Sequence, residues 1–401
     1  REPTVRLPKS IAKLTASVAA AADRHRDRHR PTGYGFAIAE HIEQLNGEHW
    51  DAVTASASLF LQRDYLSALG EAPAEGMMLR YVLLYRERTP VAAVACQLIS
   101  IDGHHVGSKR RLLQRLRTRL LVCGNVFSWG PHGVAIVAGE DPTEAWLGVG
   151  EALYRIRRAD RLAGQTGLVL VKDLYESSAP TGLHRLSYRS FASDPDMVLE
   201  HPPKVRTFAD YLAGMNAKYR KAAKDAVAGV ERGGCTVEHL TDLGPWADAA
   251  HALYLQVHDR AAVKLAAISP AYLPALAGHL GPERFRATVI HRAGVLLGFV
   301  TTLKDGDTAV AYLIGFDEAA NGDVPLYFRM LYATVEQGLA LGCRRLSLGR
   351  TALEPKAKLG AKPVSLHLAM RHRVPATNAL IRPLLRWIPH DEAPERTVFK
   401  E

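Results

Sequence analysis

The chain has 401 residues, of which 47% are apolar and 23% are charged, close to the average for folded globular domains. This composition excludes a mainly disordered, collagen-like or coiled-coil protein, and no run of about 18 apolar residues predicts a transmembrane helix. The 51 basic and 41 acidic side chains leave a net charge of +10. That charge suits an anionic partner, or equally reflects an arginine-rich composition.

The cysteine pattern bears on compartment and metal binding. The four cysteines, Cys96, Cys123, Cys235 and Cys343, lie far apart and match neither a zinc-binding spacing nor a dense disulfide framework. Cys96 and Cys343 lie in or beside apolar runs, so we expect them to be buried as small hydrophobic side chains. The pattern predicts a cytoplasmic protein without a metal site.

The first part of the chain is predicted to hold an appendage and then an α/β unit. Residues 1–33 carry a rough helical stripe and the charged repeat Asp23–Arg30, which we interpret as a solvated linker. Apolar, β-branched runs then predict strands, and apolar residues at helical spacing predict a helix. The strands are Met78–Tyr85, Val91–Ile101, Leu120–Phe127, Gly133–Val137 and Gly167–Val171, and the helix is Thr143–Ala163.

A similar order returns later in the chain. Helices are predicted over Phe208–Arg232 and Pro245–Val263, and over Leu326–Leu341, where Gly342 stands in the helix-stop position. Strands are predicted over Arg286–His291, Val295–Leu303, Thr308–Phe316 and Arg345–Leu348. The repeated order indicates an internal duplication with a boundary near the proline-rich His201–Lys204. We therefore expect α/β architecture with mixed sheets, and domains at residues 34–202 and 203–401.

Common catalytic motifs are absent from the sequence. It contains no GxxxxGK(S/T), no HExxH, no GxSxG and no protein-kinase signature set. Their absence argues against P-loop ATPases, zinc proteases of the HExxH type and α/β-hydrolases.

The most informative stretch is Asp323–Gly360. A helix leads there to a buried strand that ends at Gly349 and Arg350, and a loop with several charged residues follows. Packing alone does not readily explain charged groups at the carboxyl end of a buried strand. Open α/β sheets bind their ligands at that edge. We therefore expect a binding site around this loop.

This pattern resembles the FemAB-like, BioF2-like branch of the GNAT acyltransferase superfamily. The matching elements are Gly342, the pair Gly349-Arg350, and Lys356 followed by Gly360. Tyr211–Ala226 and Glu48–Leu69 are also similar to helices of that branch, with Val53 in place of the usual leucine. The resemblance covers residues 35–390 and implies two tandem GNAT-like domains that transfer an acyl or aminoacyl group to an amine. It implies acyl-CoA as the favoured donor, or aminoacyl-tRNA.

One departure from the family concerns the donor. GNAT enzymes that bind acetyl-CoA in the usual way have an Arg/Gln-x-x-Gly-x-Gly/Ala turn before the long helix, where backbone N–H groups hold the pyrophosphate. Neither Asp317–Pro325 nor Ala138–Thr143 fits this pattern, and their acidic residues would repel phosphate. The identity of the donor is therefore left open.

Two residues are catalytic candidates. Tyr312 would protonate the leaving group, although a tyrosine packed in the core is the favoured alternative. Glu354 would act as a general base, although a role as the counter-ion of Lys358 is favoured.

Further residues are candidates for binding substrate or donor. Arg350, Lys356 and Lys358 would bind a phosphate or carboxylate, with a solvated loop as the alternative. Tyr219 and Arg220 would face the cleft between the two units, or simply end a helix. Asp259, after the preceding helix, would bind an acceptor amine or carboxylate. Two further candidates are Tyr327 on the long helix and Gly360 in the charged loop.

Ser108–Leu121 is a basic segment with an apolar side. It could contact an anionic membrane or a nucleic-acid backbone, and a surface helix packed by its leucines is the favoured alternative. The leading hypothesis for the whole chain is direct attack of an amine on a thioester or ester without a covalent intermediate. The alternatives are a tRNA-dependent former of peptide or amide bonds and a non-catalytic module that recognises cell-envelope precursors.

Overall fold

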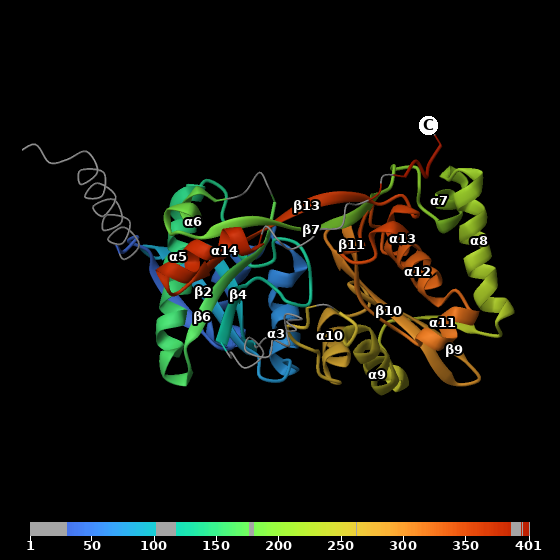
Figure 1. The fold of residues 1–401 in the computed structure, drawn as a ribbon, viewed down its shortest axis with the longest axis horizontal. Coiled ribbons are helices and arrows are strands. Elements are labelled where there is room, and N and C mark those ends of the chain that lie inside the picture. Colours follow the sequence, from blue (N-terminus) through green and yellow to red (C-terminus); the bar gives the residue numbers. More distant parts are fainter. Residues whose placement is uncertain are drawn as a thin grey trace, which may run out of the picture.

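The computed structural model describes residues 30–101, 118–175, 180–261, 263–385, 394 and 396–400. These residues form two halves that share one sheet of 13 strands, with helices on both of its faces (Figure 1).

The first half begins with a strand and two helices: β1 (Gly35–Ala39), α2 (Gly47–Thr54) and α3 (Arg63–Glu71). An antiparallel hairpin follows, and then two further strands, a long helix and a strand: β2 (Met78–Arg86), β3 (Thr89–Ile101), β4 (Thr118–Cys123), β5 (Val134–Ile136), α5 (Pro142–Ala159) and β6 (Thr166–Leu174). The hairpin, the helix and the strands predicted for this half are confirmed to within a few residues at their ends.

The second half repeats this order. It begins with β8 (Thr236–Leu240), α9 (Ala247–His258) and α10 (Tyr272–Leu280), and it continues with β9 (Phe285–Arg292), β10 (Val295–Asp305), β11 (Thr308–Phe316), α11 (Glu318–Asp323), α12 (Leu326–Ala340) and β12 (Arg345–Ser347). Each half has one parallel strand pair, β4 with β6 and β11 with β12, although in the first half the short strand β5, which pairs with β3, lies between β4 and the long helix along the chain. The repeat supports the predicted duplication.

The two halves exchange their last strands. The chain leaves the first half through α6 (Thr181–Arg185) and β7 (Arg189–Glu200), and β7 pairs with β12 of the second half. It leaves the second half through α13 (Leu353–Ala357) and β13 (Lys362–His372), and β13 pairs with β6 of the first half. Because β7 and β13 also pair with each other, the strand order is β1-β2-β3-β4-β6-β13-β7-β12-β11-β10-β9-β8, with β5 on β3.

The exchange was not predicted, although the mixed α/β class and the tandem arrangement are confirmed. Figure 1 shows β7 and β13 running from one half to the other. After β13, helix α14 (Pro375–Leu385) packs against β13 and β7, beside the first half. The boundary at residue 202 stays a prediction. Because of the strand exchange, residues 362–385 lie beside the first half in space, although they follow the second half in the sequence.

Other predictions need correction at the level of single elements. The helix predicted over Phe208–Arg232 is two helices, α7 (Phe208–Gly214) and α8 (Ala217–Arg232), because Met215 adopts an extended conformation between them. Most of Ser108–Leu121 and residues 1–29 of the appendage lie outside the described residues, and Thr118–Leu121 begins strand β4 rather than ending a helix.

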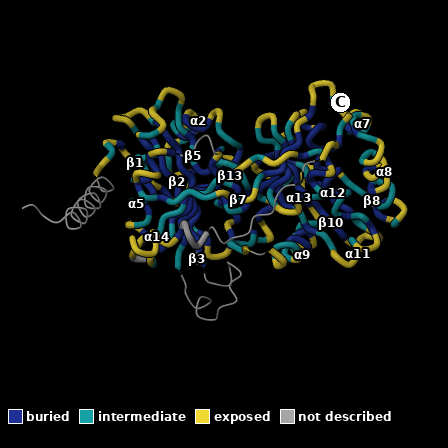
Figure 2. Tube along the Cα trace, turned by 45° about the horizontal axis from the view of Figure 1, so that its top comes forward, coloured by how far each residue is buried: buried dark blue, intermediate teal, exposed yellow. Residues whose placement is uncertain are grey.

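The core lies on both faces of the sheet. Helices α2, α3, α9 and α10 cover one face, and their buried side chains form a cluster that runs through both halves. On the other face α5 covers the first half, and α8 and α12 cover the second half. Figure 2 shows these buried segments inside both halves, with exposed residues concentrated in turns and outer helix faces.

The four cysteines are buried free thiols, as predicted for Cys96 and Cys343. Within the described part of the chain, helices long and apolar enough to span a bilayer are absent.

Candidate functional site

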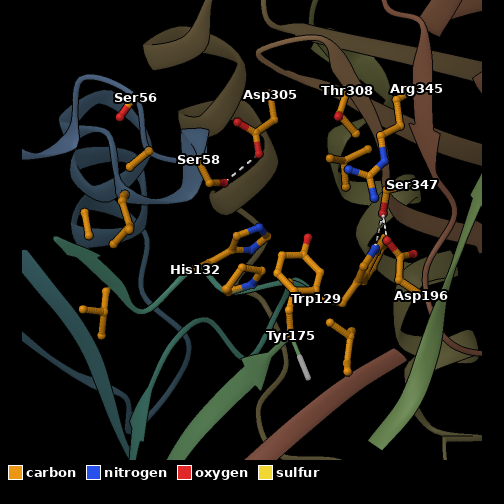
Figure 3. Close-up of a pocket in the computed structure, with 18 of the residues that line it drawn as sticks. Ser56, Ser58, Trp129, His132, Tyr175, Asp196, Asp305, Thr308, Arg345 and Ser347 are labelled. Atoms are coloured by element: carbon orange, nitrogen blue, oxygen red, sulfur yellow. Dashed lines mark hydrogen bonds between the residues drawn. The ribbon is translucent and has the colours of Figure 1, made fainter. Parts of the chain in front are cut away.

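A pocket of about 320 Å³ lies where the two halves meet (Figure 3). Strands β7, β11 and β12 line one side of it, and the segments 53–61 and 129–136 of the first half line the other. We call it the central pocket. Its polar side chains are Ser56, Ser58, Trp129, His132, Tyr175, Asp196, Asp305, Thr308, Arg345 and Ser347.

Asp196 on β7 is a buried carboxylate held in a fixed orientation. Its Oδ2 accepts a hydrogen bond from the Ser347 hydroxyl at 2.6 Å, and its Oδ1 accepts one from the Gly349 N–H at 2.9 Å. The Trp129 indole N–H of the first half donates to the same Ser347 oxygen at 2.5 Å. Burial is the largest influence on the Asp196 pKa and raises it, which is the direction expected of a proton acceptor in a pocket.

Asp305, at the end of β10, is a second carboxylate with a similar setting. It accepts from the Ser58 hydroxyl at 2.6 Å and from the Leu59 N–H at 2.7 Å. Burial raises its pKa as well. Each carboxylate thus keeps its position through one serine and one backbone N–H, so the pocket presents fixed acceptors for a positively charged group.

His132 and Arg345 complete the polar lining. The His132 ring stacks on Phe60 at 4.2 Å between centroids, and its Nδ1 lies 2.7 Å from the Ser128 hydroxyl. Burial, with the positive charges of Lys172 and Arg350, lowers the His132 pKa well below its usual value, so this ring is neutral. Arg345 has a buried Nε without a hydrogen-bond partner among the described residues.

The pocket lies beside the point where two parallel strands part. Pairing between β11 and β12 covers only three residues on each strand and stops at Val310 and Ser347. Directly beyond it, β11 carries a bulge at Tyr312 and Leu313 opposite Thr301, and the Leu313 N–H bonds the Thr301 hydroxyl at 3.1 Å. Bulges redirect backbone groups and end regular pairing, and they are frequent beside active sites.

A buried ion network stands next to the pocket. Arg350 forms an ion pair with Asp173, which is fully buried, and Lys172 bonds the other oxygen of the same carboxylate. Arg350 Nη1 also donates to the Ser193 hydroxyl at 3.1 Å. Arg350, predicted to bind a phosphate or carboxylate, is therefore committed to an internal partner.

Lys356 is also inside the protein, with 4% of its surface exposed. Burial lowers its pKa to about 8, and the negative charge of Asp196 opposes that shift. The alternative prediction for Lys356, a position in a solvated loop, is therefore wrong.

Three predicted residues, Tyr219, Glu354 and Lys358, meet at a second pocket of about 710 Å³ on the opposite face of the sheet. We call it the α8–α12 groove, and its other lining residues are Lys218, Ala222, Asp225, Ala226, Pro325, Phe328, Tyr332 and Arg396. Arg396 donates to Glu354 at 2.8 Å, and Lys358 lies 3.7 Å from the same oxygen. This geometry supports the counter-ion role for Glu354.

The other predicted residues are dispersed. Tyr312 is buried, and its hydroxyl lies 2.8 Å from that of Tyr65 and 2.6 Å from that of Tyr272. This placement matches a core tyrosine, and burial raises the Tyr312 pKa well above its usual value. Asp259 is exposed at the end of α9.

Three predicted residues have local structural partners. Arg220 donates to the Met215 carbonyl at 3.1 Å at the end of α7. Tyr327 packs between Phe316 and Phe328, and burial raises its pKa to about 12. Gly360 has φ +95°, and its Cα faces the Phe399 ring, so a side chain there would collide with that ring.

The starts of the two long helices are already capped. The Tyr327 N–H of α12 donates to Asn321 Oδ1 at 2.9 Å, and the Glu144 N–H of α5 donates to Asp141 Oδ1 at 2.8 Å. Capping side chains thus occupy N–H groups that a phosphate would need. This agrees with the absence of the usual pyrophosphate turn from the sequence.

The central pocket was not predicted from the sequence. Asp196, Asp305, Ser347 and the pair Trp129 and His132 come from four segments that only the fold brings together. One signal was available, because Asp196 directly precedes the apolar run Met197–Leu199 of a buried strand, where an unpaired carboxylate is costly. Within the described residues, clusters of side chains suited to a metal ion are absent.

Comparison with known proteins agrees with this architecture. Residues 213–357 match the family model described as an acetyltransferase (GNAT) domain. A tandem GNAT protein from the clavulanic acid biosynthesis pathway superposes with a TM-score of 0.51 at 13% identity, covering 85% of this chain and 99% of that one. FemX superposes with a TM-score of 0.51 at 10% identity, covering 88% and 99%. Comparison with curated protein sequences gives no significant match.

Proposed function

Because residues 213–357 form a GNAT acetyltransferase domain within a tandem GNAT fold, we propose that this chain is an N-acyltransferase whose acceptor amine binds in the central pocket. The observation that carries the proposal is Asp196, a buried carboxylate with a raised pKa, fixed by Ser347 and Gly349 beside the parting strands.

The lining of the central pocket suits an amine. Asp196 and Asp305 attract an ammonium group, and a volume of about 320 Å³ admits a small molecule or the end of a peptide side chain. Arg345 adds one positive charge to the wall, which would bind a carboxylate on the same acceptor. The proposed acceptor is therefore an amine that also carries a carboxylate.

The α8–α12 groove is the proposed site for the donor. Its aromatic side chains, Tyr219, Phe328 and Tyr332, offer faces for a nucleobase, and Lys218, Lys358 and Arg396 offer charges for phosphates. Acyl-CoA is the donor that we favour for this groove. Since the helix starts are capped, its phosphates depend on these side chains instead of a backbone cradle. The acyl end would reach the central pocket where β11 and β12 part.

The reaction needs no covalent intermediate. The amine nitrogen attacks the thioester carbonyl, the C–S bond breaks, and the thiolate leaves with the rest of the donor. Asp196 takes the proton that the nitrogen loses, and the Trp129–Ser347 hydrogen bond keeps the carboxylate in position. A backbone N–H where β11 and β12 part, other than that of Leu313, which already bonds Thr301, would stabilise the oxyanion, and binding both substrates supplies proximity.

The test is an acyl-transfer assay with acetyl-CoA and a panel of amino acids and short peptides, read by release of free thiol and by product mass. Asp196→Asn keeps the shape of the side chain and removes the base, so we expect kcat to fall about 100-fold or more, with a smaller rise in KM because Asp305 still attracts the ammonium group. Asp307→Asn is the control, because Asp307 is an exposed carboxylate paired with Arg344. Equal activity of wild type and Asp196→Asn would overturn the assignment of the base.

The capped helix starts favour aminoacyl-tRNA as the alternative donor, since this donor needs no pyrophosphate cradle. Mass spectrometry of the protein as purified distinguishes the two through a bound CoA species or bound RNA. Binding of tRNA that weakens steeply with salt would select the alternative. Failure of acyl-CoA and charged tRNA alike to bind or react would contradict the acyltransferase proposal as a whole.

A further inference from the structure

A basic pocket lies in the first half, where α5 ends and β6 begins. Its volume is about 490 Å³, and it shares no lining residue with the central pocket. Four arginines line it: Arg157 and Arg158 from α5, Arg161 just after α5, and Arg373 just after β13. Exchange of the last strand therefore brings Arg373 to this place from the far end of the sequence.

Among the described residues, none of the four arginines has a carboxylate partner within ion-pair distance. Arg373 donates a hydrogen bond to the side chain of Gln165, which carries no charge. Burial lowers the pKa of Arg157, and the nearby charges of Arg371 and Arg373 lower it further. The last turn of α5 favours cations, which accounts for Arg157 and Arg158 but not for the arginines that arrive from other segments.

A buried hydroxyl without a partner lines the same pocket. Thr166 is 3% exposed, and its Oγ1 has no hydrogen-bond partner in the described structure. Buried polar atoms are nearly always bonded, so the Thr166 hydroxyl marks a place in this pocket where a ligand atom would be stabilised.

We propose that this pocket binds the phosphate or diphosphate group of a small ligand. Guanidinium groups bind phosphate oxygens in pairs of parallel hydrogen bonds, and a diphosphate carries enough negative charge to offset several arginines at once. A single carboxylate would leave most of the positive charge uncompensated. Thr166 would donate its hydroxyl to one further phosphate oxygen. The site is independent of the proposed acyl transfer, since it takes no residue from the central pocket or from the α8–α12 groove.

Titration calorimetry with inorganic pyrophosphate at constant ionic strength tests the proposal. We expect wild type to bind, and Arg157→Gln/Arg373→Gln to bind at least about tenfold more weakly. Arg155→Gln is the matched control, because Arg155 lies on the same helix but pairs with Glu151. Vesicles of phosphatidylcholine with phosphatidic acid form the second arm. Binding to vesicles alone, with the same dependence on Arg157 and Arg373, would show that the phosphate belongs to a lipid headgroup.

Two results would overturn the site. One is that wild type and the double variant bind both probes equally. The other is that the double variant unfolds several degrees below wild type in phosphate-free buffer. Without a ligand these arginines repel one another, so their replacement by glutamine should leave the unfolding temperature unchanged or raise it. A marked loss would mean that the arginines serve the fold.

Discussion

Trp129 of the first half and Ser347 of the second are joined by a hydrogen bond of 2.5 Å from the indole Nε1 to the serine oxygen. The same serine donates to Asp196, so a residue of the first half orients the carboxylate that we assign as the base. Neither half could form this arrangement alone. Mutations at the junction of the halves should therefore affect chemistry as well as stability.

Gly349 tests this connection. It has φ +81°, and a Cβ at this position would lie 3.0 Å from Trp129 Cε2, so Gly349→Ala must move the indole as well as strain the backbone. Loss of the Trp129 hydrogen bond should lower kcat about tenfold, measured in the acyl-transfer assay. Gly342→Ala is the control, since Gly342 has φ +75° and a Cβ added there would meet no atom within 4 Å. Equal kcat values for the two variants would separate Trp129 from catalysis.

The pKa of Asp196 predicts the shape of the pH profile. A base acts only when ionised, and burial raises the Asp196 pKa, so the acid limb of log kcat should lie above the usual range of aspartate. Activity should rise with pH through that limb and then level off. Stopped-flow or initial-rate measurements between pH 4 and 8 would show it. In Asp196→Asn the residual activity should lack this limb, and its persistence there would assign it to another group.

The elements that could be predicted from sequence are those whose pattern is local. In the hairpin at residues 78–101 and the helix at 326–340, the apolar residues that recur along the sequence are the ones that are buried. Strands β7 and β13 could not be found this way. They carry Pro195, Asp196, Lys362, Pro363 and His367, and their partners belong to the other half. Pairing across the junction, rather than propensity, makes these segments strands.

The site shows the same limit. The Gly349-Arg350 pair was predicted to mark a binding site, and the structure gives each residue an internal partner: Trp129 covers Gly349, and Asp173 pairs with Arg350. Both partners lie in the first half, far away in sequence. A charge after a buried strand therefore indicated a special position but not whether a ligand or the protein itself neutralises it.

The Arg350–Asp173 pair should be important for stability. Asp173 is fully buried and has φ +60°, a conformation that asparagine tolerates, so Asp173→Asn removes the charge without adding backbone strain. The variant leaves Lys172 and Arg350 buried without their counter-ion, and we expect a loss of about 3–5 kcal/mol in the free energy of unfolding, measured in urea.

A double variant is the control for this prediction. Adding Arg350→Met to Asp173→Asn removes one of the uncompensated charges, so part of the lost stability should return. Additive losses would indicate that the two residues act separately, contrary to the ion pair.

Acid should weaken the fold through His201. Burial lowers its pKa to about 4, whereas the unfolded chain binds a proton near pH 6.5. Below pH 6.5 the unfolded state therefore holds more protons, and the free energy of unfolding falls as the pH drops toward 4, by at most about 1.4 kcal/mol per pH unit for this group. Above pH 7 the contribution is constant. Urea unfolding of wild type and His201→Gln between pH 4.5 and 7.5 measures the difference, and the variant should have the shallower slope. Parallel slopes would mean that His201 takes up a proton equally in both states.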